Sequence, residues 1–310
     1  MPLIRACAWT GRRRIKMVDT PLAEVAEKDP SRLGLALRSD FFYAFKRSPV
    51  AVVSFALVAL LVLSAVFAPL IAPYDPFDPA SLNLMNGFSA PMTPNAFTGE
   101  TFWLGTDDQG RDVFSTILYG MRISLFVGAA AVAFAMVLGI TLGLLAGYVG
   151  GWTETIIMRT ADVQLTFPAI LVAMLIFGVA KGITPVEYRD QMAIWVLIIA
   201  IGLSDWVQFA RVVRGATLVE KNKEYVAVAK LIGRSGPAIM ARHILPNVLS
   251  PVLVIATISL ALAIIAEATL SFLGVGAPPT QPSLGTLIRI GQGFLFSGEW
   301  WILLFPAVTL

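Results

Sequence analysis

Side chains able to carry out chemistry are scarce in this chain of 310 residues. Its one cysteine, Cys7, excludes an internal disulfide and a thiolate metal cluster. Its one histidine, His243, excludes every site that needs two imidazoles from one chain. No G-x-x-x-x-G-K-[ST] segment is present to cradle a phosphate. We therefore expect no catalytic residue and no metal ligand, which argues against a membrane enzyme and a self-powered pump.

Two acidic residues, Asp205 and Glu267, lie inside strongly apolar segments. Ionisable residues at membrane depth are costly and are therefore candidates for function. We expect both within two turns of a span end, where snorkelling or an interhelical hydrogen bond competes with a contact to the transported substrate. Arg159 and Asp162 share a helix face and are predicted to pair with each other. For His243, an interfacial hydrogen bond is favoured over a pH-sensing role.

The composition places these residues in a bilayer. Apolar residues make up 57% of the chain and charged residues only 14%, against about 25% charged in soluble domains. The sequence predicts an all-α integral membrane protein in which a sixth apolar segment, opened by Trp300 and Trp301, stops at Leu310 and is too short to cross. We expect either that the chain lacks its C-terminal end or that the sixth segment is abnormal. The five complete spans are predicted at 49–72, 123–150, 156–180, 192–213 and 248–273.

The chain divides into three parts. Residues 1–48 form a polar tail with a basic cluster at 12–16, a candidate start at Met17 and an interfacial helix over 33–48. Residues 49–120 hold the first span and a long acidic loop. Residues 121–310 form the core, and the interval 274–298 within it is predicted to be a loop.

A basic interval at 211–247 separates the fourth and fifth spans. Its pattern predicts a helix ending near Gly233, an elbow at that glycine, and a second short helix ended by Leu245 and Pro246. Small side chains at 227–229 would let another protein approach the first helix closely. The interval is interpreted as a docking element.

A second segment, 104–112, precedes the second span with the sequence LGTDDQGRD. Thr106 and Gln109 have the spacing of a capping box, and Asp107 and Asp108 suit a helix N-terminus. The residues leave a well-capped helix and a functional role equally open.

Small residues recur every four positions in the second span, which favours close helix packing over a lining for a transport path. They are Ala131, Ala135, Gly139, Gly143 and Gly147.

Charge predicts the orientation. The tail and the basic interval hold 17 of the 23 lysines and arginines, whereas the loops at 73–120, 181–190 and 274–298 hold four. The positive-inside rule then places the N-terminus and the interval 211–247 in the cytoplasm.

A secondary transporter usually shows internal repeats, and none is found in this sequence. A channel would not explain the docking element. A translocation subunit driven by a separate ATPase explains both that element and the lack of a phosphate-binding loop.

Residues 224–247 resemble the EAA loop of binding-protein-dependent ABC importer permeases, whose pattern is E-A-A, three residues, Gly, nine residues, I-x-L-P. Anchored on Gly233, Ala227-Val228-Ala229 stands for E-A-A and His243-Ile244-Leu245-Pro246 for the end. Ala227 and His243 depart from the pattern. Glu224, Tyr225 and the segments 104–112 and 267–274 are similar to the C-type subunit of the dipeptide, oligopeptide and nickel branch.

The resemblance covers about residues 35–310. It implies the type I ABC importer fold, six spans, and a bacterial inner-membrane location. Implied partners are a B-type permease subunit, two ATPases that carry ATP and Mg²⁺, an extracytoplasmic binding protein and the bilayer, with no nucleic acid and no cofactor in this chain. Di- or oligopeptides are the expected substrate, with nickel chelates or another nutrient as alternatives and a channel that uses no ATP as a weaker one.

Two sets of site residues follow from it. The residues implied to couple to the ATPases are Glu224, Tyr225, Ala227, Ala229, Gly233, Arg234, His243, Leu245 and Pro246. The extracytoplasmic motif comprises Gly105, Asp107, Asp108, Gly110, Arg111 and Asp112, and Asp205 and Glu267 remain candidates for the path or for interhelical bonds.

Overall fold

The computed structural model describes residues 45–78, 82–278 and 280–310. The chain divides into two compact units, Met1–Leu57 and Val58–Leu310, which are described separately. In the first unit, the rings of Phe45 and Phe55 meet edge to face with centroids 5.7 Å apart. The expected basic anchor, the start at Met17 and most of the interfacial helix at 33–48 fall outside the described residues.

The first apolar segment forms helix α3, Pro49–Val66, followed after Phe67 by the short helix α4, Ala68–Ile71. Pro69 lies in the first turn of α4, where the missing amide hydrogen of proline is tolerated. The described residues contain no strand, only two isolated bridges in the loop before α5. That loop also holds a 3₁₀ turn, η2, at Leu84–Asn86.

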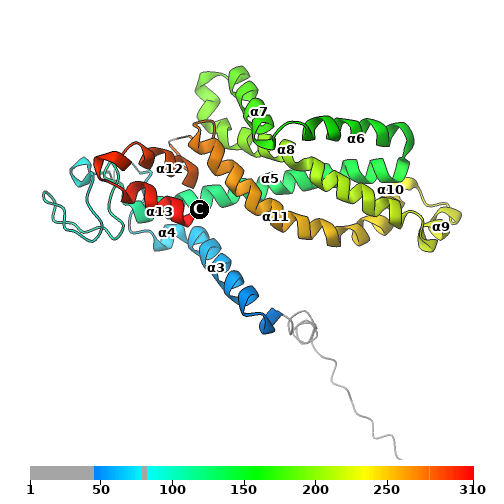
Figure 1. Ribbon diagram of the computed structural model, residues 1–310, viewed down its shortest axis with the longest axis horizontal. Coiled ribbons are helices and arrows are strands. Elements are labelled where there is room, and N and C mark those ends of the chain that lie inside the picture. The colour runs from blue at the N-terminus through cyan, green and yellow to red at the C-terminus, as the bar shows by residue number, and fades with distance from the viewer. Residues whose placement is uncertain (1–44, 79–81, 279) are drawn as a thin grey trace, which may run out of the picture. The chain divides into compact units, whose positions relative to one another are not determined.

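Three long helices form the body of the second unit (Figure 1). They are α5, Val113–Val149, α8, Arg189–Glu220, and α11, Leu245–Phe272. At 37 residues, α5 is about 55 Å long, longer than a hydrocarbon core of about 30 Å. It begins ten residues before the predicted start of the second span, because Asp112 caps it within the outer loop.

The repeated small residues of α5 pack against α8, as predicted. A Cβ added to Gly139 would lie 2.4 Å from the Cβ of Phe209, and one added to Gly143 would lie 2.7 Å from the Ala210 carbonyl oxygen. Gly147 faces Thr217 in the same way. The small residues therefore set the distance between the two helix axes.

The segment predicted as the third span, 156–180, is not one continuous helix. Helices α6, Gly151–Leu165, and α7, Ala169–Ile183, are bent by 97° at the break before α7. Pro168 lies at this break, where its ring disfavours helical geometry in the residue before it.

The predicted pairing of Arg159 with Asp162 is also wrong. Asp162 instead accepts a hydrogen bond from Arg211 of α8 at 2.6 Å. One turn further along α8, Arg214 pairs with Glu154 of α6. Both ion pairs therefore join neighbouring helices. Their partners lie far apart in the sequence, so local spacing could not reveal them.

The later elements also revise the sequence picture. A short turn, η3, at Val186–Tyr188 leads into α8. Beyond α8 come α9, Glu224–Leu231, α10, Gly236–Ile239, and a π-helical turn, η4, at Met240–Ile244 that continues into α11. The interval predicted to be a loop contains α12, Leu284–Gln292, and η5, Leu295–Ser297, before α13, Trp301–Thr309.

Four helices of the described residues are long and apolar enough to cross a membrane, or five if α6 and α7 count as one bent span. Figure 1 places α9 at one end of the second unit and α12 with α13 at the other. The two motifs singled out in the sequence thus lie at opposite ends of α5, α8 and α11.

Candidate functional site

Helix α9 has one face anchored in the protein and one face free. Val226 is fully buried and Ala229 is 5% exposed, and both join the main apolar core. On the other side Leu231 is 86% exposed and Ile232 74% exposed, next to the exposed side chains of Ala227 and Val228. An eight-residue helix is marginal alone, so the buried pair holds it in place while an apolar surface remains open.

Gly233 ends α9 with a left-handed backbone, φ 80°. The amide of Arg234 donates to the Ala229 carbonyl at 3.1 Å, the long-range bond of a Schellman cap. A Cβ built on Gly233 meets nothing within 4 Å. Within this chain a side chain at Gly233 would therefore not be crowded, and the left-handed backbone is what favours glycine at the predicted elbow.

A chain of hydrogen bonds through Tyr225 joins α9 to the two long helices beside it. The Tyr225 hydroxyl donates to Glu220 Oε2 at the end of α8, at 2.5 Å. Asn247 Nδ2 of α11 donates to the Tyr225 oxygen at 3.2 Å and to the His243 carbonyl at 2.9 Å. These bonds connect α9 to both α8 and α11.

Basic side chains surround this arrangement. Lys221 Nζ donates to the Gly147 carbonyl at the end of α5, at 2.7 Å, and Lys230 lies over the ring of Tyr148, with Nζ 5.5 Å from the centroid. Lys223 binds Glu220 Oε1 at 2.6 Å, and this hydrogen bond raises the pKa of Lys223 above its ordinary value. Burial, and then the hydrogen bond to Glu220, raise the pKa of Tyr225 above its ordinary value.

The coupling residues expected from the sequence occupy different surroundings. Glu224, Ala227 and Arg234 are exposed, whereas Ala229 is buried on the inner face and His243 is half-buried, its carbonyl accepting from Asn247. The ring of His243 lies 6.4 Å from that of Tyr225.

Leu245 and Pro246 do not end a separate short helix, so that prediction is wrong. They open α11 within a continuous helical stretch, Gly236–Phe272. The proline is tolerated because it stands in the first turn after the π-helical segment.

The sequence reasoning missed the side chains that shape this site. Glu220 and Asn247, the partners of Tyr225, and Leu231 and Ile232, the exposed apolar pair, were not selected. Apolar residues at the C-terminal end of a short helix flanked by lysines were the signal available for the exposed pair.

The motif at 104–112 is largely buried and organises the loop before α5. Asp107 accepts hydrogen bonds from the amides of Gln109, at 2.9 Å, and Arg111, at 2.8 Å, and from Arg111 Nε at 2.6 Å. Burial raises the pKa of Asp107, and the charge of Arg111 opposes that rise. Asp108, by contrast, is half-buried and leaves Oδ1 without a partner among the described residues.

The expected capping box at Thr106 and Gln109 is wrong. The cap of α5 is Asp112, whose Oδ2 accepts from the Ser115 amide at 2.9 Å. Thr106 instead donates to the Asn86 carbonyl and accepts from the Ser89 amide. The motif has capping residues for a helix that begins later than the spacing suggested.

The two intramembrane acids have different roles. Glu267 is fully buried and accepts hydrogen bonds from Ser124 of α5, at 2.7 Å, and Ser271, at 2.6 Å. Asp205 is half-buried near the middle of α8 and makes no hydrogen bond or ion pair with another residue in the described ranges. Helix α8 continues to Glu220, beyond the predicted end of the fourth span at 213, so the expectation that Asp205 lies near a span end stays a prediction.

Two families of known proteins match separate parts of the chain. Residues 139–310 match the family described as binding-protein-dependent transport system inner membrane component, and residues 37–91 match the N-terminal transmembrane domain of oligopeptide transport permease C.

Several curated relatives resemble this chain over most of their length. The oligopeptide transport system permease protein OppC of Bacillus subtilis is 34% identical over 89% of this chain and 84% of its own. The dipeptide transport system permease protein DppC of Haemophilus influenzae is 35% identical over 92% and 89%. The glutathione transport system permease protein GsiD of Pectobacterium atrosepticum is 38% identical over 81% and 77%.

Proposed function

We propose a function on one premise: this chain belongs to the family of inner membrane components of binding-protein-dependent transport systems. The chain is a multi-pass membrane protein with the type I ABC importer fold of that family, and it is a transport subunit rather than an enzyme. Its role is that of a permease subunit for peptides, in agreement with the names of its relatives. Nickel chelates or another small nutrient remain the alternative cargo.

The partner set extends the proposal. A B-type permease would complete the translocation path, two ATPases would supply ATP hydrolysis with Mg²⁺, and an extracytoplasmic binding protein would deliver the peptide. The charge distribution supports a cytoplasmic N-terminus and a cytoplasmic α9. The motif at 104–112 would then lie outside, facing the binding protein's side of the membrane.

The observation that carries the proposal is the free apolar face of α9. Ala227, Val228, Leu231 and Ile232 offer small and aliphatic side chains on a helix that is fixed from behind by Val226 and Ala229. Such a surface suits a groove on an ATPase, the helix-in-groove mode of recognition. Glu224 and Arg234 lie at its two ends, where charged groups can set the orientation of the partner.

Coupling would follow from the hydrogen bonds behind that face. If ATP binding draws the ATPases together, α9 moves with them, and Tyr225 passes the motion to Glu220 and Asn247. ATP needs only to favour one arrangement of the spans over the other to shift their populations. Asp205, near the middle of α8 and without a side-chain partner in the described ranges, is a polar group that could contact the substrate on the way.

The first experiment is a pull-down of the tagged full chain in mild detergent from cells that express all candidate partners. Recovery of a second permease and one or two ATPases supports the proposal, and a chain that purifies alone contradicts it. Ligands retained by the recovered binding protein then separate peptides from nickel chelates.

Leu231→Glu tests the docking face directly. A carboxylate in an apolar interface loses its hydration, so we expect ATPase recovery to fall by at least about tenfold, the equivalent of roughly 1.4 kcal/mol. Leu84→Glu is the matched control, since Leu84 is 76% exposed in the outer loop, far from α9. Equal recovery from both variants would refute the assignment of α9.

A further inference from the structure

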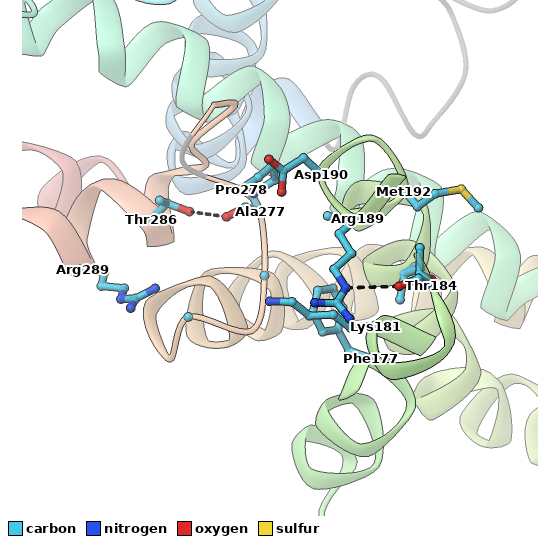
Figure 2. Close-up of a pocket in the computed structure, with 14 residues that line it drawn as sticks. Phe177, Lys181, Thr184, Arg189, Asp190, Met192, Ala277, Pro278, Thr286 and Arg289 are labelled. Atoms are coloured by element: carbon cyan, nitrogen blue, oxygen red, sulfur yellow. Dashed lines mark hydrogen bonds between the residues drawn. The ribbon is translucent and has the colours of Figure 1, made fainter. Parts of the chain in front are cut away.

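A second polar feature lies at the other end of the long helices from α9. A cavity of about 100 Å³ opens between the end of α7, the start of α8, the loop after α11, and α12. Its charged lining consists of three cations, Lys181, Arg189 and Arg289, and one acid, Asp190. Figure 2 shows Lys181 and Arg189 lying together near Phe177, while Arg289 extends from α12 on the other side of the loop after α11.

The walls of the cavity are well fixed. Arg189 Nε donates to the Thr184 carbonyl at 3.2 Å. Across the cavity, Thr286 Oγ1 donates to the Ala277 carbonyl at 3.3 Å, and the Ala277 amide donates to Ser271 Oγ at 3.1 Å. These bonds hold the loop after α11 against α12.

The absence of a side chain at Gly274 leaves room for the guanidinium of Arg289. A Cβ built on Gly274 would lie 2.5 Å from Arg289 Nη1, so the guanidinium lies directly over this glycine. Gly274 also has φ 79°, a conformation that side chains other than glycine rarely adopt.

The cations lack internal partners. Within the described part of the chain, Lys181 and Arg289 make no ion pair, and Arg189 uses one nitrogen on a carbonyl. The lining carries three cations against one acid, and a bound anion would offset the excess positive charge. Guanidinium groups bind carboxylates with paired hydrogen bonds, and lysine adds a point charge.

The volume of the cavity limits the size of the group that it can hold. Its volume equals roughly three water molecules at about 30 Å³ each, which admits a carboxylate but not a whole peptide. Phe177 and Val196 line the apolar part beside the cations. The cavity therefore suits an acid group attached to a larger molecule that lies outside it.

We propose that Lys181, Arg189 and Arg289 form a receiving site for the terminal carboxylate of the transported peptide as it enters from the extracytoplasmic side. This inference rests on the proposed peptide importer and on its orientation. The site holds one end of the peptide while the remainder extends toward the path between the spans.

The test uses the full importer, with its ATPases and binding protein, in proteoliposomes. Cys7→Ser removes the natural thiol and Ala193→Cys places one in the cavity wall. We compare labelling by an anionic and a cationic methanethiosulfonate, each normalised to a free thiol. We expect the anionic reagent to react faster by roughly tenfold, the equivalent of about 1.4 kcal/mol of favourable potential.

Variants assign that preference to the cavity. Lys181→Gln combined with Arg289→Gln should bring the ratio of the two rates close to one. Arg122→Gln, which removes an exposed arginine of α5, should leave the ratio unchanged. A free dipeptide at high concentration should slow labelling, and the same dipeptide with an amidated C-terminus should not.

The outcomes separate the inference from the proposed function. Peptide uptake by the unmodified importer without a charge preference at Ala193→Cys overturns the receiving site alone. Protection by the binding protein regardless of peptide overturns it in favour of an acidic side chain of that protein. Failure of the unmodified importer to take up any peptide overturns both.

Discussion

Gly110 in the outer loop and Gly233 beside α9 have nearly the same backbone, with φ 75° and 80°, in opposite surroundings. A Cβ on Gly110 would lie 2.1 Å from the Asn83 carbonyl oxygen, whereas one on Gly233 would meet nothing within 4 Å. The outer motif is buried and closed upon itself, and α9 is anchored on one side only. The two ends of the long helices therefore differ in packing: a closed loop at one end and a helix with one free face at the other.

The largest effect is expected from Gly110→Ala. The added methyl would overlap the Asn83 backbone, so the outer loop must open, and we expect a loss of at least about 4 kcal/mol of unfolding free energy. Unfolding in detergent, followed by the fraction of monodisperse protein after heating, measures it.

Gly99→Ala is the matched control for Gly110→Ala, because Gly99 has φ 72° and open space around it. It should lose only about 1–2 kcal/mol from backbone strain. Equal losses in the two variants would show that conformation alone, not crowding, governs the outer motif.

Asp107→Ala should come next. It would leave the buried Arg111 guanidinium without its acid, and breaking a buried pair in this way costs about 3–5 kcal/mol. The midpoint of thermal unfolding in detergent measures this loss. Asp108→Ala, at the neighbouring half-buried acid, should change that midpoint little. If Asp108→Ala proves the more damaging, the hydrogen bonds of Asp107 do not organise the loop.

At the other end, Gly233→Ala should cost only about 1–2 kcal/mol, since strain is the sole penalty within this chain. Gly233→Asn should cost less, because asparagine tolerates the left-handed region. Thermal unfolding of the isolated chain compares the two. A loss as large as that of Gly110→Ala would contradict the one-sided anchoring of α9.

Tyr225→Phe should have the smallest effect on stability, about 1 kcal/mol for its lost hydrogen bonds. Its effect on coupling should be larger: ATP hydrolysis by the assembled importer would continue while peptide uptake per ATP falls. Tyr188→Phe, at an exposed tyrosine, is the control. Unchanged uptake per ATP in Tyr225→Phe would remove the hydrogen-bond chain from the coupling route.

The sequence predicted what depends on local pattern. The apolar runs located α3, α5, α8 and α11, Gly233 located the end of α9, and the small residues of α5 identified a packed face. Each of these follows from helical periodicity or from one residue's backbone preference, which neighbours in sequence are enough to reveal.

The rest depends on partners far apart in the chain. Asp162 pairs with Arg211 of another helix and not with Arg159 of the same helix. Glu267 accepts a hydrogen bond from Ser124, 143 residues away. The bend before α7 was signalled by Pro168, but hydropathy alone treated 156–180 as one span. Helix α12 was not predicted, because its apolar residues form a stretch too short to be recognised as a span.

The π-helical turn at Met240–Ile244 sets the angular phase of everything that follows it. A π turn holds about one residue more than an α turn, and each residue of an α-helix corresponds to about 100° of rotation. Removing one residue there would therefore act less as a shortening of about 1.5 Å than as a twist of α11 about its own axis. Such a twist would turn Glu267 away from Ser124 at the far end of the helix. The π-helical turn near α9 therefore determines which way the side chains of α11 face some 25 residues later.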